Sequence, residues 1–164
     1  MYVRLGRFAN DDDDYKTFKR EEDIVIHNYD TWNMDHTLAL LIVPMLKQLK
    51  KTKHGAPSVD TSDVPLFLKP TQLEVVRYKE DGTTDKNFFK RWDYVMDEMI
   101  WAFEQIVDDD DEKQFYDHSD IDPEDSMEVS VKKLKVDHEG LDAHNKRIEN
   151  GLRLFGKYYR SLWD

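Results

Sequence analysis

Three carboxylates lie along one flank of a helix predicted over residues 87–107, and their spacing suggests metal-dependent chemistry. Asp93, Asp97 and Glu104 are separated by four and seven residues, which places them on one side of a helix. Together with His36 they offer ligands with which a divalent metal activates water or binds phosphates. An ordinary acidic face of an amphipathic helix has the same pattern, so this second interpretation stays open. His36 also fits a structural hydrogen-bonding role, because a helix N-terminus disfavours the charged imidazole.

A wider group of polar and aromatic residues occurs in segments that are otherwise apolar enough to be predicted as part of the hydrophobic core. A buried polar group needs compensating partners, so we expect any ligand to bind where these residues gather. The predicted ligand-binding residues are Tyr29, Asp30, Trp32, Asp35, His36, Asp97 and Trp101. Part of this polarity has a structural alternative, with Asp30 as a helix cap and Trp32 as an apolar cover.

Four basic residues follow one side of the predicted last helix, opposite its apolar stripe. They are Lys146, Arg153, Lys157 and Arg160. In that arrangement they are candidates for binding a nucleotide phosphate or a nucleic-acid backbone. The alternative is a solvated face that pairs with the acidic loop over residues 108–128.

Three windows rich in aromatic and apolar residues must position these side chains, and they hold all four tryptophans. We expect helices from Asp30 or Asn33 toward His54, over residues 87–107 and over residues 141–163. The first reads as the central buried helix, because residues 38–46 are apolar nearly all round. Strand candidates are residues 23–27, 73–78 and 127–136. The sequence therefore predicts an α+β, mainly helical fold with three long packed helices and a small antiparallel sheet.

Helical periodicity also predicts which faces are buried. In the helix predicted over residues 87–107, the apolar stripe is Phe88, Trp92, Val95, Met96, Met99, Phe103 and Ile106. In the helix predicted over residues 141–163, it is Leu141, Ile148, Leu152, Phe155, Tyr159 and Leu162. Each stripe recurs every three or four residues, which is typical of the core side of an amphipathic helix.

The net charge of -11 is concentrated in one segment. Residues 108–128 carry eleven Asp or Glu against the single Lys113, a local balance of -10, and read as a solvated acidic loop. An imitation of DNA would need charge spread at phosphate-like spacing, and the acidic balance argues against direct DNA binding. With a polar N-terminal arm over residues 1–22, the 164 residues fit a single domain.

Several functional classes are excluded by what the sequence lacks. There is no cysteine, which excludes disulfides and thiol chemistry and favours a reducing cytoplasm. The longest apolar run, Leu38 to Leu46, is less than half of the roughly 20 residues that a membrane span needs. Neither a P-loop nor a G-x-G-x-x-G or G-x-S-x-G motif occurs. No cofactor is therefore predicted, apart from the divalent metal considered above.

Three runs of the sequence carry a resemblance to a known family. They are "DTWNMDHTLA" with "PMLKQLKKTKHGAP", "RWDYVMDEMIWAFEQ" and "RIENGLRLFGKYYRSLWD". They resemble a family of small proteins encoded by tailed bacteriophages, cyanophages among them, and the likeness covers about half of the chain. The family has no established activity, so the resemblance implies a phage origin and the host cytoplasm but supplies no catalytic residues.

The function expected from these observations is a non-enzymatic phage accessory protein that acts by binding. It would sequester a host protein or a small nucleotide as a host-takeover or anti-defence factor. One alternative is a metal-dependent nucleotide or phosphoester hydrolase that uses the four residues considered first. Another is a virion or assembly component, and a homo-oligomer stays open.

Overall fold

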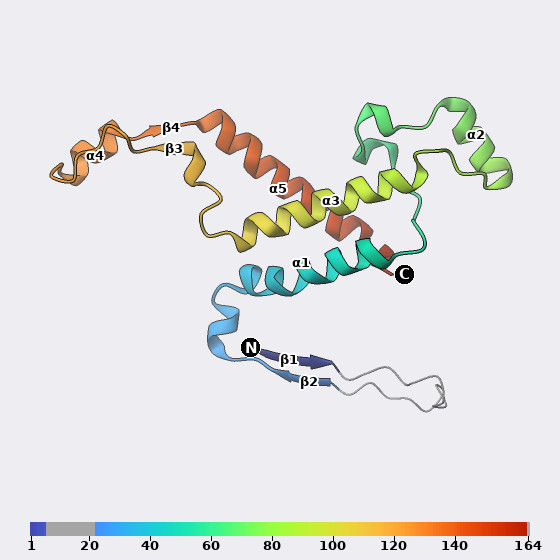
Figure 1. Ribbon diagram of the computed structural model, residues 1–164, viewed down its shortest axis with the longest axis horizontal. Coiled ribbons are helices and arrows are strands. Elements are labelled where there is room, and N and C mark those ends of the chain that lie inside the picture. The colour runs from blue at the N-terminus through green and yellow to red at the C-terminus, as the bar shows by residue number, and fades with distance from the viewer. Residues whose placement is uncertain (6–21, 164) are drawn as a thin grey trace. The chain divides into compact units, whose positions relative to one another are not determined.

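The computed structural model describes residues 1–5 and 22–163, and the chain divides into two compact units, Met1–Leu38 and Ala39–Asp164. The fold is α+β and mainly helical, as predicted (Figure 1). The long packed helices are α1 (Met34–Thr52), α3 (Phe88–Val107) and α5 (His138–Tyr158). Two small sheets of two antiparallel strands accompany them.

The first unit contains a strand pair and a short turn of helix. Strand β1 (Tyr2–Leu5) pairs with β2 (Glu22–Val25), with Tyr2 opposite Val25, and a 3-10 turn follows at Asn28–Thr31. The strand predicted at residues 23–27 is thus confirmed in its first part. Of the predicted polar arm, residues 2–5 form a strand, and residues 6–21 lie outside the described residues.

Helix α3 lies at the centre of the second unit. Six of its seven predicted stripe residues are buried and Ile106 is half-buried, so the predicted core face is confirmed. The helix begins after Asn87 and ends before Asp108, where a run of acidic residues opposes the negative end of the helix dipole.

The prediction that the first helix is the central buried one is wrong. Helix α1 buries only Ala39 and Leu46 among its described residues, whereas Leu40 and Met45 are exposed. An all-apolar run is buried only when neighbours cover every side. Within the second unit, one side of α1 packs on the core around α3, and the rest of its surface is left open.

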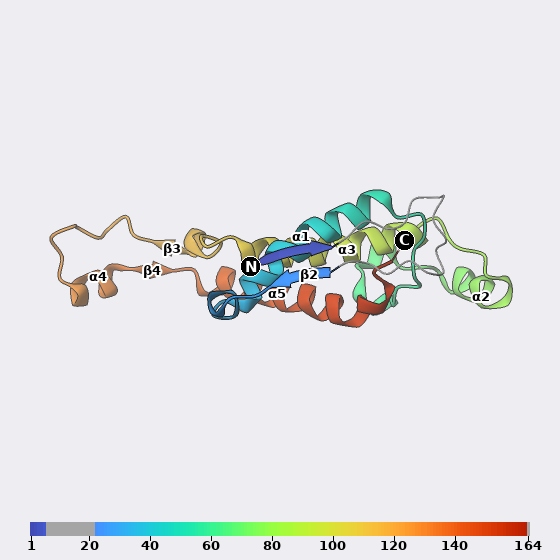
Figure 2. The same ribbon diagram turned by 90° about the horizontal axis from the view of Figure 1, so that it is seen from below.

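Helix α5 packs against α3, and the two lie against each other in both views (Figures 1 and 2). Its buried residues are His144, Gly151, Leu154 and Tyr158. The buried face predicted for this helix is therefore wrong in part, because Leu152 and Tyr159 are exposed and the other predicted residues are half-buried.

The reason lies at Gly151. A Cβ added there would lie 2.3 Å from the Cβ of Ala102 and 2.6 Å from the carbonyl oxygen of Glu98. The two helices thus approach most closely at a residue without a side chain. A prediction from apolar residues alone leaves out Gly151 and His144, and it therefore misplaces part of the face of α5 that contacts α3.

The strand predicted over residues 73–78 is wrong, because this segment is helix α2 (Gln72–Asp81). Thr71 and Glu74 form a capping box, in which the Glu74 carboxylate accepts the Thr71 N–H at 2.7 Å. Gly82 ends the helix with φ of 76°, in the left-handed region that glycine adopts without strain. These local signals outweigh the β-branched residues that favoured a strand.

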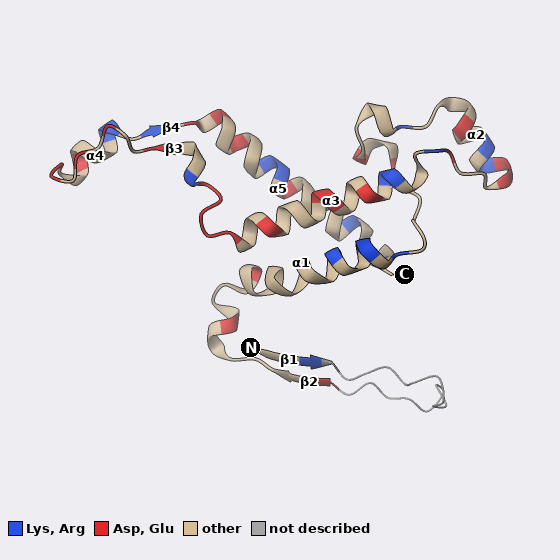
Figure 3. Cartoon of the chain, in the orientation of Figure 1, with Lys and Arg blue, Asp and Glu red and all other residues tan. Residues whose placement is uncertain are grey.

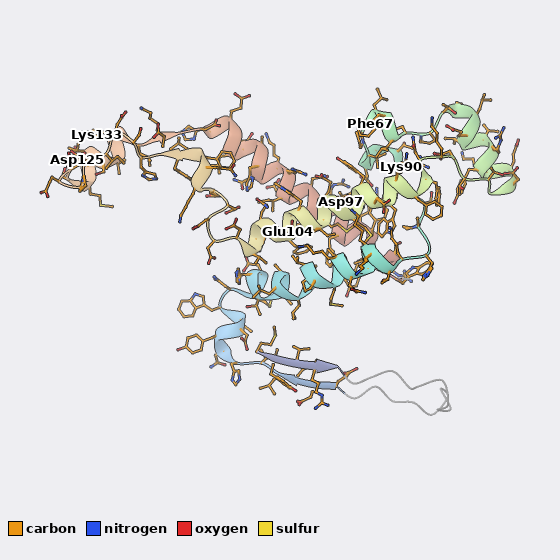
Figure 4. All side chains as sticks on the ribbon, in the orientation of Figure 1. Phe67, Lys90, Asp97, Glu104, Asp125 and Lys133 are labelled. Atoms are coloured by element: carbon orange, nitrogen blue, oxygen red, sulfur yellow. The ribbon has the colours of Figure 1, made fainter. Side chains whose placement is uncertain are left out.

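The segment between α3 and α5 is a hairpin rather than a single loop. Strand β3 (Tyr116–Asp117) pairs with β4 (Lys135–Val136), and helix α4 (Met127–Lys133) lies between them. The strand predicted over residues 127–136 is therefore wrong except for its last two residues. Figure 3 shows the acidic run that follows α3, and Figure 4 shows Asp125 near Lys133, whose charged groups lie 2.6 Å apart.

Candidate functional site

The three carboxylates of α3 form salt bridges with three lysines at the C-terminal end of α1, of which Lys53 follows the last helical residue. Lys47 Nζ lies 2.6 Å from Glu104 and Lys53 Nζ lies 2.6 Å from Asp93, and Lys50 pairs with Asp97 between them. The lysine with the highest residue number pairs with the carboxylate of lowest number, because α1 and α3 run antiparallel. We call this set of three pairs the lysine ladder. Figure 4 marks Asp97 and Glu104 on α3.

The lysine ladder bears on the predicted metal site. Among residues 1–5 and 22–163, no group of three or more His, Asp or Glu side chains could hold a metal ion. Each of Asp93, Asp97 and Glu104 already neutralises an ammonium group, which a metal would have to displace. Beside the ladder is a shallow, open depression, lined by Lys47, Lys50, Lys51, Asp97 and Ile100.

The predicted ligand site is divided between the two units. Tyr29, Asp30, Trp32, Asp35 and His36 belong to the first unit, and Asp97 and Trp101 belong to the second. Their convergence stays a prediction. Within the first unit, Tyr29 and Trp32 are exposed, Asp35 lies in the first turn of α1, and His36 is half-buried.

Asp30 belongs to a capping box of the 3-10 turn at Asn28–Thr31, as its third residue, and is not the N-cap of the first long helix as considered from the sequence. Its carboxylate accepts the His27 backbone N–H at 2.7 Å and the amino group of Met1 at 2.8 Å. The hydrogen bond from the terminal amino group, with that from His27, holds the pKa of Asp30 below its ordinary value.

The basic residues of α5 are mostly engaged with carboxylates of this chain. Lys146 pairs with Asp142 at 2.5 Å, and Arg153 and Lys157 reach Asp63 at 2.8 and 2.6 Å. Arg160 makes no salt bridge with any residue that the structure describes. The basic face thus binds the loop around residues 60–63 and not the acidic segment.

Asp63 is the centre of that contact, and its side chain is only 3% exposed. Burial alone would raise its pKa, but hydrogen bonds from Lys157, Tyr158 and Arg153 together hold the pKa below its ordinary value. Burial and the bond to Asp63 raise the pKa of Tyr158 to about 12. No local signal marks Asp63 in the sequence, because its partners lie ninety and more residues away.

A second polar cluster, around the buried carboxylate of Glu98, lies between α3 and α5. Glu98 accepts two hydrogen bonds from the Arg147 guanidinium, at 3.0 and 2.8 Å, and that guanidinium stacks over Trp101 at 3.9 Å. Trp101, one of the predicted ligand-binding residues, is half-buried here, and so is Tyr94. Burial and then the charge of Glu98 raise the pKa of Tyr94.

His144 is buried in the same interface. Its Nε2 lies 3.0 Å from Asp111, and its ring lies between those of Trp101 and Phe115, at 5.3 and 5.2 Å. Sequence reasoning missed this pair, because Asp111 reads as one acid in a run. The contact fastens the start of the acidic segment to α5.

Three of the four most exposed large apolar side chains among residues 39–163 lie before α3. Leu66, Phe67 and Leu73 are 83%, 76% and 81% exposed, whereas Leu68 between them is buried. The Leu68 carbonyl accepts a hydrogen bond from Arg91 at 3.0 Å, which fixes this turn against α3. The sequence signal is the run Pro65 to Pro70, which places apolar residues in a turn rather than in a core helix.

Comparisons with protein families, with curated proteins and with solved structures found no match. Within the described part of the chain, no helix combines the length and the apolar character that crossing a membrane requires.

Proposed function

We propose that the protein is a non-enzymatic binding protein of a tailed bacteriophage, which acts in the host cytoplasm by sequestering a host protein. The observation that supports this is the exposure of Leu66, Phe67 and Leu73, three large apolar side chains within one short segment. Exposed apolar clusters on a folded unit are typical of protein contact surfaces.

A host protein is favoured over a small nucleotide as the partner. Small-molecule sites are concave and enclose most of their ligand. The depression beside the lysine ladder is shallow and open, and two of the three lysines that line it already pair with carboxylates. The same pairing weighs against the hydrolase alternative, whose carboxylates would have to be free to bind a metal.

The test is to cross-link the affinity-tagged protein in phage-infected cells, identify its neighbours by mass spectrometry and titrate the purified partner calorimetrically. We expect one host protein to bind in a fixed ratio. Nucleotide hydrolysis with Mg²⁺ or Mn²⁺ that is lost in Asp97→Asn, but kept in the exposed control Asp109→Asn, would support the hydrolase instead. A fixed copy number in purified virions, without a host partner, would support the assembly component.

A further inference from the structure

Lysines that form no salt bridge concentrate around one part of the second unit. Within residues 39–163, the lysines that make no salt bridge are Lys51, Lys69, Lys79, Lys86 and Lys90. All but Lys51 fall between residues 66 and 91. This segment carries six Lys or Arg against four Asp or Glu, a balance of +2 in a chain of net charge -11.

These lysines flank the exposed apolar side chains. Lys69 follows Phe67 by two residues, and Lys86 and Lys90 bracket the start of α3, where the Asn87 side chain donates to the Phe67 carbonyl at 3.4 Å. Figure 4 labels Phe67 and Lys90 on these neighbouring segments. We call Leu66, Phe67 and Leu73 with Lys69, Lys86 and Lys90 the apolar-basic surface.

The backbone that carries this surface is held in place by contacts beneath it. Arg91 is buried and binds both the Leu68 carbonyl and the carboxylate of Asp85, at 3.0 Å and at 2.6 Å to its nearer oxygen. The hydrogen bonds from Arg91 keep the pKa of Asp85 below its ordinary value, which favours the charged carboxylate. A surface whose backbone is already fixed loses less entropy on binding.

Resting on the proposed function, we propose that the apolar-basic surface docks an acidic segment of a partner protein that carries two or three large apolar anchors. The anchors would bury Leu66, Phe67 and Leu73, and the acidic side chains would pair with Lys69, Lys86 and Lys90. Charge complementarity selects this chemistry, because these lysines make none of the salt bridges that engage most other lysines of the second unit.

A nucleic acid or an anionic lipid surface fits less well. Both present dense negative charge, which the excess of acidic residues elsewhere in the chain would repel. Neither offers separate apolar anchors interleaved with carboxylates at side-chain spacing.

The test is to select a displayed library of random 16-residue peptides on the full-length protein and to measure peptide affinities by fluorescence polarisation. We expect the enriched peptides to be acidic and to carry Leu, Phe or Trp. Phe67→Ser, Leu66→Ser and the triple change of Lys69, Lys86 and Lys90 to Glu should each weaken binding by about tenfold or more, as loss of an anchor does. Higher salt should weaken binding to the wild type.

Two controls match these changes. Met127→Ser removes an apolar side chain of similar exposure, 85%, and Lys51→Glu reverses an unpaired lysine outside the surface. Both should leave the affinity within about twofold of the wild type, since they touch no predicted contact. Melting temperatures should stay close to that of the wild type in every variant, because the altered side chains are exposed.

The outcomes separate this inference from the proposed function. Peptides or a host protein that bind equally well to Phe67→Ser and to the triple variant overturn the inference and leave the proposed function standing. No binding of any peptide or host protein overturns both. Binding of phosphatidylserine vesicles or of single-stranded DNA that is lost in these variants overturns the partner class. Self-association in sedimentation that is lost in Phe67→Ser makes a second copy the occupant and overturns the proposal.

Discussion

Both sides of α3 carry a carboxylate that pairs with a basic side chain of another helix, but the two carboxylates differ in exposure. Asp97 faces α1 and belongs to the lysine ladder, with a side chain that is 56% exposed. Its neighbour Glu98 faces α5, is 11% exposed and accepts two hydrogen bonds from Arg147. One residue of separation thus distinguishes an exposed carboxylate from a buried one, although Arg147, the partner of Glu98, is itself 47% exposed.

Burial of the carboxylate, and not the pairing of charges, sets what each interaction contributes to stability. An exposed ion pair contributes about 0 to 1 kcal/mol, because water and salt screen it. A buried carboxylate such as Glu98 depends more on its partner, because removal of that partner leaves an uncompensated charge. The α5 side should therefore be sensitive to substitution, and the α1 side should be tolerant.

The largest effect should come from the apolar part of the α5 side. Phe103 is buried and meets the ring of Phe155 with centroids 4.9 Å apart. Phe103→Ala should lower the free energy of unfolding by about 3 to 5 kcal/mol, through lost burial and the cavity left behind. Urea denaturation would measure this, with Phe89→Ala as an exposed control on the same helix. Equal effects of the two changes would show that Phe103 is not a core residue.

The next effect tests how closely α3 and α5 approach. Gly151→Ala places a methyl group against Ala102 and the backbone of Glu98, so it should destabilise by about 1 to 3 kcal/mol. Gly156 lies in the same helix with nothing near its Cβ position. Gly156→Ala should instead stabilise by about 0.5 to 1 kcal/mol, because alanine favours a helix. Thermal unfolding of both variants checks the opposite signs. Destabilisation by both changes would contradict the difference in packing between Gly151 and Gly156.

The adjacent carboxylates give the most direct test of the comparison. Glu98→Gln should cost about 1 to 3 kcal/mol, because it removes charge-assisted hydrogen bonds in a buried place. Asp97→Asn should cost at most about 1 kcal/mol, and that cost should shrink in salt. Denaturation in low and high salt distinguishes the two. A larger loss for Asp97→Asn would mean that the lysine ladder is the stronger of the two contacts.

A smaller effect should appear as a pH dependence at Asp63. Its folded pKa lies below the ordinary value of 3.8, so its contribution is present above that pH and is lost as pH falls through the folded pKa. The wild type should therefore lose stability in acid below about pH 4 more steeply than Asp63→Asn does. Denaturation midpoints between about pH 2 and pH 6 measure the two slopes. Parallel slopes would mean that other carboxylates carry the acid sensitivity.

Much of the fold could be predicted from the sequence, because one helix dominates it. The stripe from Phe88 to Phe103 has a single helical period, and the structure buries it as expected. Segments with weak periodicity were misread. Alternating Met127, Val129 and Val131 resemble a strand, but they lie exposed on the short helix α4. On α2, the capping box of Thr71 and Glu74 was the informative signal.

The candidate sites were harder to predict, because their partners are distant in the chain. The carboxylate flank of α3 was located correctly, but a sequence does not show that Lys47, Lys50 and Lys53 face it. The contact of His144 with Asp111 likewise depends on how the hairpin returns to α5. Such tertiary pairs leave no local spacing to read.

The β3–β4 pairing has a consequence for what the chain can accommodate. Tyr116 pairs with Val136 and Asp117 pairs with Lys135, which closes the hairpin at its base. Beside these pairs, the Asp137 N–H donates to the Phe115 carbonyl at 2.9 Å. The residues between β3 and β4 are thus separated from the α3–α5 contact. Lengthening a closed loop costs only about 0.6 kcal/mol for each doubling. The turn near Pro123 is therefore a place where an inserted sequence, even a whole folded domain, could be carried without disturbing the helices.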